Sequence, residues 1–266
     1  MLLTQNSIID AHAHCGRQYA SPPQDLDDYL ACARGTGIAG VVVFPPVMEI
    51  YDRNDPDFQD DSYWLQRRGN ANEYLLTLTD RELEVIPYLF IWNDFAVEQL
   101  APAHRGIKWH RHSDEPRYHY DDPRCTAAIE EIRRRNMPVC LEEEWRNTLR
   151  FIDELAPGVR VIIPHCGFLN GGYDLFCTHD IWRRPNIFTD TALAPPEVVA
   201  DYVRRYGHER IMFGSDFPFG DPGEELENVL RLGFPADVRD AITGFNVRRL
   251  LSNSNSIHIP IFPSPI

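Results

Sequence analysis

Residues 7–14 read SIIDAHAH, a short apolar run that ends in two histidines. A run of this length and composition is typical of a buried strand. Because alternate side chains of a strand share a face, we expect Asp10, His12 and His14 to point the same way. Buried polar groups need partners, so two interpretations stay open: a polar strand end with hydrogen-bonded histidines, or two imidazole ligands of a divalent metal.

Seven more apolar runs follow along the chain. They are GIAGVVVFPP (37–46), LEVIPYLFIW (83–92), GIKWH (106–110), PVCLEE (138–143), VRVIIPHC (159–166), NIFTDT (186–191) and RIMFGSD (210–216). Amphipathic stretches between the runs predict helices, including 123–137, 195–207 and 234–252. Eight strands alternating with helices in about 250 residues predict an α/β fold, a single-domain (β/α)8 TIM barrel over residues 1–252. A doubly wound open sheet is the alternative, but no GxGxxG motif follows the first run.

Two segments fall outside this pattern. The polar stretch PVMEIYDRNDPDFQDD (46–61) is long enough to form a lid over the barrel mouth. The end of the chain, residues 253–266, is rich in Ser, Asn and Pro, and we expect an irregular arm on the surface or at a subunit contact.

Composition limits the class of partner. The net charge of -14 argues against nucleic acid or an anionic membrane surface, since both attract basic patches. No apolar run reaches the length of a membrane span, and the first residues, MLLTQNS, do not resemble a signal peptide, so we expect a cytoplasmic protein. The six cysteines form no CxxC pair, which favours free thiols over a disulfide framework.

Polar residues gather at the predicted strand ends. In barrels of this kind, functional groups lie at the C-terminal ends of the strands. Five of the eight runs end in residue types that bind metals or protons, namely His12 and His14, Lys108 and His110, Glu142, His165, and Asp216. A shared site at the barrel mouth explains all five endings together.

The ordered set of motifs resembles the amidohydrolase superfamily, in the branch of metal-dependent hydrolases that includes aminocarboxymuconate-semialdehyde decarboxylase. The resemblance is carried by IIDAHAH (8–14), the segment from GIKWHRH (106–112) to PVCLEEE (138–144), VIIPHCG (161–167), RIMFGSDFP (210–218) and the terminal AITGFNVRRLL (241–251). These segments span nearly the whole chain in the expected order. The resemblance implies a TIM barrel that carries out metal-dependent chemistry on a small molecule.

The resemblance also implies roles for individual residues. His12 and His14 match the first-strand pair that binds a divalent cation, usually zinc. Asp216 matches an eighth-strand aspartate that ligates the metal and accepts a proton from the attacking water. His165 matches a sixth-strand histidine that serves as a second-metal ligand or as a catalytic acid or base. Lys108 matches a fourth-strand lysine that some branches carboxylate into a bridging ligand and others leave as a free amine.

One position departs from the family. The fifth strand usually ends PVLIHTG, with a histidine ligand, whereas this chain has PVCLEEE and places Glu142 there. A carboxylate can also bind zinc, and two carboxylates shift the preference towards manganese, iron or magnesium. We therefore expect a metal set of His12, His14, Glu142, His165 and Asp216. The alternative is a dead or remodelled site in which Glu142 forms a salt bridge with Lys108.

The expected function is a metal-dependent hydrolase that acts on an amide, lactone or ester bond of a small carboxylated molecule through metal-activated water. Asp216 and His165 are the expected catalytic residues, and Lys108 and His110 are expected to bind the substrate. His112, His119 and His179 lie in predicted loops that could cover the site, although surface histidines are common. Two alternatives stay open: a non-oxidative decarboxylase of a small aromatic acid, and a barrel without catalysis. The resemblance further implies a possible homodimer.

Overall fold

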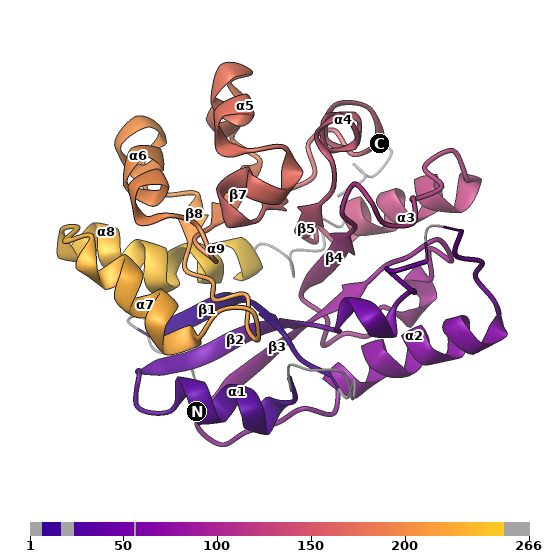
Figure 1. The fold of residues 1–266 in the computed structure, drawn as a ribbon, viewed down its shortest axis with the longest axis horizontal. Helices are drawn as coiled ribbons and strands as arrows, with labels where there is room; N and C mark the ends of the chain where they lie inside the picture. Colours follow the sequence, from indigo (N-terminus) through magenta and orange to yellow (C-terminus); the bar gives the residue numbers. More distant parts are fainter. Residues whose placement is uncertain (1–6, 17–23, 56, 253–266) are drawn as a thin grey trace, which may run out of the picture.

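The computed structural model describes residues 7–16, 24–55 and 57–252, which form a nearly closed barrel of eight parallel strands with helices around it (Figure 1). The strands are β1 (Ile8–His14), β2 (Ile38–Phe44), β3 (Glu84–Phe90), β4 (Gly106–His110), β5 (Val139–Glu142), β6 (Val161–Ile163), β7 (Ile187–Asp190) and β8 (Ile211–Met212). Each strand pairs with the next one along the chain, and each lies within its predicted range. The predicted TIM barrel is confirmed. The expected arm, residues 253–266, lies outside the described residues.

The helices alternate with the strands and cover the outside of the barrel. They are α1 (Leu26–Ala33), α2 (Ser62–Leu75), α3 (Pro123–Arg134), α4 (Trp145–Arg150), α5 (Tyr173–Thr178), α6 (Pro196–Tyr206), α7 (Pro222–Arg231), α8 (Ala236–Asp240) and α9 (Asn246–Ser252). Local sequence sets their starts: Asp122 and Asp221 each accept a backbone N–H of the first turn, and a proline follows each of them. The helix predicted over 234–252 consists of α8 and α9 joined by a π-helical turn at Ala241–Phe245.

The barrel closes where its first and last strands meet. The backbone N–H of Asp216, just after β8, donates to the carbonyl of His12 at 2.7 Å. The N–H of His14 donates to the carbonyl of Phe217, also at 2.7 Å. We call this junction the seam. It brings the two histidines of β1 beside the aspartate that follows β8.

A bulge in β1 sets the direction of those histidines. Asp10 pairs with Val41 and Ala13 with Val43, so three residue steps of β1 face two steps of β2. Asp10 consequently points away from the barrel interior, where it accepts hydrogen bonds from the hydroxyls of Tyr29 (3.1 Å) and Ser215 (2.5 Å). The prediction that Asp10 shares a face with the two histidines is therefore wrong, because the extra residue breaks the alternation between them.

The barrel interior is apolar below its polar mouth. Its cluster comprises Ile9, Ala11, Val42, Phe44, Ile86, Tyr88, Cys140, Ile162, Phe188 and Met212, together with Val247, Leu250 and Leu251 of α9. Helix α9 lies at the strands' N-terminal ends, where Arg248 donates to the Ser7 carbonyl and Arg105 donates to the Leu251 carbonyl. One end of the barrel is thus closed by α9, and the polar strand ends lie at the other.

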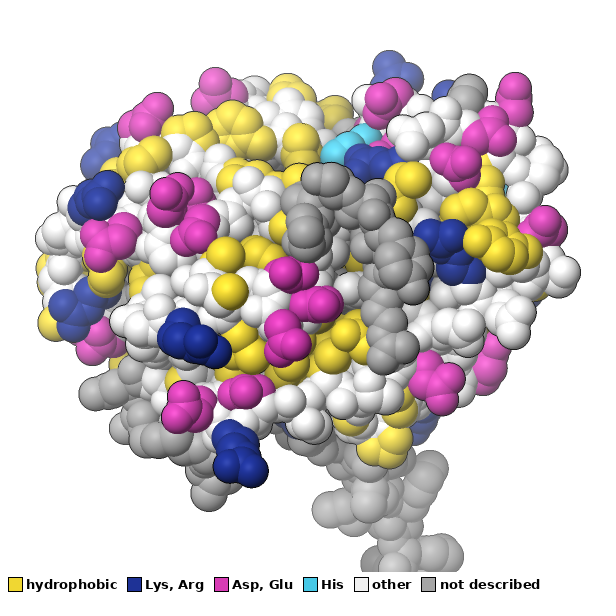
Figure 2. Space-filling view, turned by 60° about the horizontal axis from the view of Figure 1, so that its bottom comes forward, with side chains coloured by type: hydrophobic (Ala, Val, Ile, Leu, Met, Phe, Trp, Pro, Cys, Tyr) yellow, Lys and Arg dark blue, Asp and Glu magenta, His cyan; other side chains and the backbone are white. Residues whose placement is uncertain are grey.

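The surface carries mixed charge. On the face drawn in Figure 2, acidic and basic side chains are interspersed, with small groups of hydrophobic side chains between them. The excess of negative charge is therefore spread over this face rather than gathered in one patch.

Within the described part of the chain, none of the helices has both the length and the apolar composition needed to cross a membrane.

Candidate metal centre

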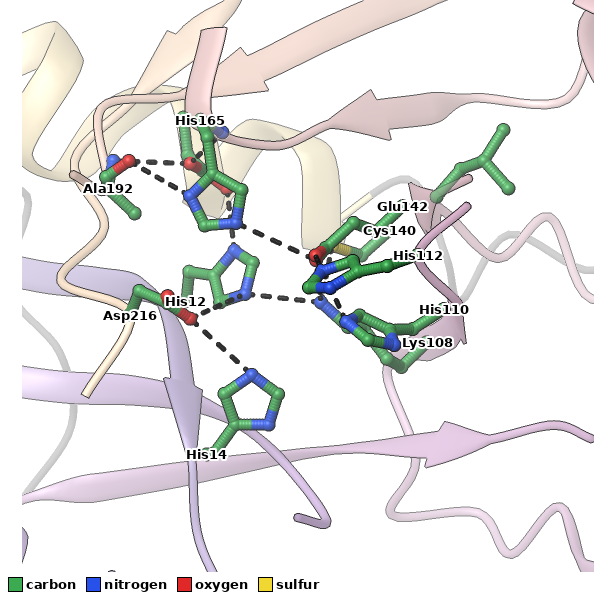
Figure 3. A network of polar contacts seen from close by, with 12 residues as sticks. His12, His14, Lys108, His110, His112, Cys140, Glu142, His165, Ala192 and Asp216 are labelled. Carbon is green, nitrogen blue, oxygen red and sulfur yellow. Dashed lines mark hydrogen bonds and ion pairs between the residues drawn. The ribbon is translucent and has the colours of Figure 1, made fainter. Parts of the chain in front are cut away.

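The structure brings the predicted site residues together at the barrel mouth (Figure 3). They come from the ends of five strands and the turns that follow, and they are His12, His14, Lys108, His110, Glu142, His165 and Asp216. All of them are buried, with exposed fractions of 6% or less. Two groups can be distinguished within the site, one around Asp216 and one around Glu142.

The first group has the geometry of a metal-binding triad. The Nε2 atoms of His12 and His14 each lie 3.4 Å from the same oxygen, Oδ1 of Asp216. Ligands of a tetrahedral zinc ion lie about 2.0–2.2 Å from the metal, which places neighbouring ligand atoms about 3.3–3.5 Å apart. Both nitrogen–oxygen distances match such a site, and the three donor atoms lie within 4.8 Å of one another, so these residues could hold one divalent ion. We call these residues the first ligand set.

Hydrogen bonds fix the orientation of both imidazoles. Nδ1 of His12 lies 2.9 Å from Oδ2 of Asp190, and Nδ1 of His14 lies 3.3 Å from the carbonyl oxygen of Pro45. Both partners are acceptors, so each Nδ1 carries the proton and each Nε2 presents its lone pair to the centre. A carboxylate or carbonyl behind a histidine is the usual support of a metal ligand.

His165 is held by the chain just after β6. Its backbone N–H donates to Oδ1 of Asp190 at 2.9 Å, and its Nδ1 donates to the carbonyl of Ala192 at 2.9 Å. Both His165 and Asp216 have a φ of +56°, a left-handed conformation that costs free energy for residues other than glycine. Surrounding hydrogen bonds maintain this strained backbone at two of the proposed catalytic positions.

Glu142 is the centre of the second group. Its Oε2 lies 3.1 Å from Nζ of Lys108 and 3.6 Å from Nε2 of His165. Its Oε1 lies 3.0 Å from Nε2 of His110 and 2.7 Å from Nε2 of His112. The salt bridge with Lys108, which belongs to the alternative interpretation of Glu142, is thus present within a wider network of imidazoles.

Burial and charge shift the pKa values in opposite directions. Burial raises the pKa of Asp216, but the contact with the His14 imidazole and the charge of His165 outweigh it and lower the pKa to about 2. Burial lowers the pKa of His165, but the hydrogen bond to Glu142 and the charge of Asp216 raise it to about 9. At His12, burial dominates and lowers the pKa to about 4. The protein therefore places a carboxylate, an imidazolium and a neutral imidazole side by side.

The segment predicted as a lid packs against the same mouth. Tyr51 is fully buried, stacks on Trp92 with ring centroids 4.0 Å apart, and donates to Glu115 at 2.6 Å. Arg53 donates to Nδ1 of His112 at 3.0 Å and forms an ion pair with Glu115. The first part of this segment therefore covers the mouth and also contributes a buried side chain, Tyr51, to the hydrophobic core. Residue 56 lies outside the described residues.

Sequence reasoning missed part of the site. Asp190 is the last residue of β7, so the search for polar residues at the C-terminal ends of strands could have found it. His112, for which the sequence left open a loop over the site or an ordinary surface position, contacts Glu142 and is the more exposed partner, with 30% of its side chain accessible. No periodic signal marks a loop histidine. Lys108 and His110, expected to bind substrate, are both paired with Glu142.

Comparisons with solved structures show the same fold in enzymes of two kinds. The chain matches 5-carboxyvanillate decarboxylase from Sphingomonas paucimobilis at 13% identity and a TM-score of 0.72, covering 93% of this chain and 99% of that one. A dihydroxybenzoic acid decarboxylase from Polaromonas, solved with bound manganese, matches at 13% identity and a TM-score of 0.69, covering 96% and 99%. A Pseudomonas putida protein assigned as a 2-pyrone-4,6-dicarboxylic acid hydrolase matches at 18% identity and a TM-score of 0.60, covering 93% and 98%.

Sequence comparison matches one part of the chain to a known family. No curated protein matches the chain significantly. A family model described as amidohydrolase matches residues 150–252, which include His165, Asp190 and Asp216. The chain thus shares the TIM-barrel fold with these enzymes over nearly its whole length, and its C-terminal part, residues 150–252, is similar to the amidohydrolase family.

Proposed function

We propose that the protein is a divalent-metal-dependent hydrolase that cleaves an amide, lactone or ester bond of a small carboxylated molecule. The observation that carries this proposal is the first ligand set, in which two oriented imidazoles lie 3.4 Å from one carboxylate oxygen. His12, His14 and Asp216 would hold the ion. Two imidazoles with one carboxylate favour zinc, and manganese, iron and magnesium are the alternatives to test.

The bound ion would supply Lewis acidity, which polarises a carbonyl group and makes water more acidic. Asp216 is an ionised carboxylate at the mouth and is placed to accept the proton of the attacking water. His165 lies across from it, with Nδ1 donating to the Ala192 carbonyl and Nε2 facing Glu142. From this position it donates a hydrogen bond to the developing oxyanion or a proton to the leaving group.

Glu142 and its partners form the wall opposite Asp216. We propose that Lys108 and His110 bind a substrate carboxylate only where that carboxylate displaces contacts to Glu142, since both are buried against it. Arg53 and His112 reach solvent on the same side, with 25% and 30% of their side chains exposed. They are the better first contacts for an anionic group that enters the mouth. Ligation of the ion by Glu142 requires the loss of its salt bridge.

Decarboxylation of a small aromatic acid is the second candidate. The observation that favours it is an aromatic surface beside the ligands. The exposed aromatic side chain is Phe219, which is 57% accessible and whose ring lies 6.1 Å from that of His14; Phe44, whose ring lies 4.9 Å from that of His12, is fully buried. A planar ring can stack against such side chains while its carboxylate approaches the ion. The same residues would then serve carbon–carbon bond cleavage.

The test compares metal-free and metal-loaded protein on two substrate panels. One panel holds lactones, amides and esters of small carboxylic acids, and the other holds hydroxylated benzoates assayed for carbon dioxide release. We expect hydrolysis of at least one member of the first panel, lost with chelator and in His14→Ala, but kept in His119→Ala, a control at an exposed loop histidine. Carbon dioxide release alone would establish the second candidate. No metal uptake with zinc or manganese would leave a barrel without catalysis.

A further inference from the structure

Lys108 is a fully buried cation in the middle of the polar network (Figure 3). Its Nζ lies 3.2 Å from Nε2 of His12 and 3.1 Å from Oε2 of Glu142. The Sγ atom of Cys140 at 3.8 Å and the ring of Phe44, whose centroid is 4.6 Å away, enclose it further. Atoms from β1, β2 and β5 thus surround an ammonium group that β4 supplies.

This ammonium lies between two groups of possible metal ligands. Besides the first ligand set, the side chains of His12, Glu142 and His165 bring three donor atoms within 4.8 Å of one another. We call these three the second ligand set. Nζ of Lys108 already contacts two of its members, His12 and Glu142, at hydrogen-bonding distance. A positive charge therefore occupies the place that a second divalent ion would take.

We infer that Lys108 serves as a built-in cation for the second ligand set, so that the centre takes one divalent ion, held by the first ligand set. The inference rests on the proposed function, because it concerns the same centre and states its metal content. It also gives the glutamate at the end of β5 a role. Glu142 balances the charge of Lys108 rather than that of a second ion.

Electrostatics explain why the two cations exclude each other. A divalent ion bound to Glu142 and His165 would lie close to the ammonium, in an interior where charges are poorly screened. The Glu142 carboxylate offers one negative charge, which the salt bridge with Lys108 already uses. Carboxylation of Lys108 would replace the ammonium by an anion beside Glu142 and the lone pair of His12. Lys108 accordingly stays an uncarboxylated ammonium group.

His12 adds a second reason. Its Nδ1 donates to Asp190, so Nε2 has one lone pair, which either Lys108 or a metal ion can use. An ion in the first ligand set takes this lone pair, and Lys108 then keeps only its contact with Glu142. Two ions cannot share it. A second ion could therefore bind only through Glu142, His110 and His112, whose donor atoms also lie within 4.8 Å of one another, and only after the ammonium is removed.

The test is calorimetric titration of metal-free, full-length protein with zinc chloride or manganese chloride. We expect one binding site in the wild type and in Lys108→Arg, which keeps the positive charge. We expect a second, weaker site in Lys108→Met, which frees the Glu142 carboxylate. The double variant Lys108→Met/Glu142→Gln should return to one site, because the carboxylate is gone. Near-ultraviolet circular dichroism checks folding, and Lys108→Gln replaces Lys108→Met if the latter does not fold.

The outcomes separate this inference from the proposed function. Two sites in the wild type, or one site in both neutral variants, would overturn the inference and leave a metal-dependent enzyme intact. No site in the wild type would overturn the proposed function, and the inference with it. Carbon-13 NMR after incubation with labelled bicarbonate should show no carbamate signal. A carbamate signal that disappears in Lys108→Arg would show a carboxylated lysine and overturn the inference by an independent route.

Discussion

Nδ1 of His12 lies 2.9 Å from Oδ2 of Asp190, although the two residues are 178 positions apart in the chain. The other oxygen of Asp190 accepts the backbone N–H groups of His165 and Ala192. One carboxylate therefore orients the β1 imidazole and also holds the turn after β6. A single side chain at the end of β7 links the proposed metal ligand to the proposed acid.

Replacing this carboxylate should weaken metal binding. In Asp190→Asn, the amide can turn its NH2 group towards Nδ1 of His12, which would move the proton to Nε2 and remove the lone pair from the centre. We expect a 10- to 100-fold loss of zinc affinity, roughly the effect of losing such a supporting partner. Calorimetric titration measures the zinc affinity, and Asp174→Asn, at an exposed position of α5, is the matched control. Equal affinity in both variants would show that Asp190 does not support the ligand.

The free energy of unfolding should decrease as pH falls, because of the buried His104, which lies far from the mouth. Burial lowers its pKa to about 4, from 6.5 for the unfolded chain, and Nδ1 accepts the N–H of Ala101 at 3.0 Å. Above pH 6.5 both states are neutral. Between pH 6.5 and 4 only the unfolded chain binds the proton, so the free energy of unfolding decreases as pH falls.

Urea unfolding at several pH values measures this dependence. His104→Asn should be less sensitive to pH than the wild type between pH 6.5 and 4, while exposed His119→Asn should keep the wild-type slope. An unchanged slope in His104→Asn would mean that His104 is protonated equally in both states.

Removing one partner of a buried ion pair behind the mouth should strongly destabilise the fold. Nη1 of Arg111 lies 2.5 Å from Oε1 of Glu143, both side chains are fully buried, and Tyr120 donates to the second carboxylate oxygen at 2.7 Å. Arg111→Met leaves that carboxylate uncompensated, and we expect a loss of about 3–5 kcal/mol in the free energy of unfolding.

Two further variants show whether the lost charge is the cause. Arg111→Met/Glu143→Leu should recover part of the loss, because no buried charge is left unpaired. Arg183→Met breaks an exposed pair with Asp180, whose side chains are 65% and 74% accessible, and should cost at most about 1 kcal/mol. A loss of that small size in Arg111→Met would contradict the prediction.

Two glycines should respond in opposite ways to alanine. A Cβ at Gly106, the first residue of β4, would lie 2.4 Å from the ring of Tyr88 in the barrel interior. Gly106→Ala should therefore lower the free energy of unfolding by about 1–3 kcal/mol. At Gly69, within α2, the nearest atom to a new Cβ is 3.9 Å away, so Gly69→Ala should raise it by about 0.5–1 kcal/mol. Denaturant unfolding of the two variants decides both expectations.

Strand positions were predictable because the runs are short, apolar and separated by helical patterns. The polar residue that ends each of several runs also predicted where the site would form, and His12, His14, His165 and Asp216 do lie together. The direction in which a side chain points was harder to predict from the sequence. DAHAH (10–14) alternates evenly in sequence, and the bulge that separates Asp10 from the two histidines depends on pairing with β2.

Contacts made by loops were the least predictable part. His112 and Glu115 belong to no periodic pattern, and their partners Tyr51 and Arg53 come from a segment whose polar composition suggested solvent exposure. Burial of Tyr51 depends on the surface that Trp92 offers after β3, which only the folded chain provides. Such long-range packing leaves no local signal in the sequence.

The seam has a consequence for the kinetics of the fold. The first ligand set takes two residues from β1 and one from the turn after β8, so an ion bound there would tie the opposite ends of the barrel sequence and close a loop of about 200 residues. Such an ion binds only when both ends are in place, and it would act as a reversible cross-link. If the seam forms late in folding, the ion would slow unfolding and leave the folding rate nearly unchanged. Resistance to proteolysis would then follow the lifetime of the bound ion.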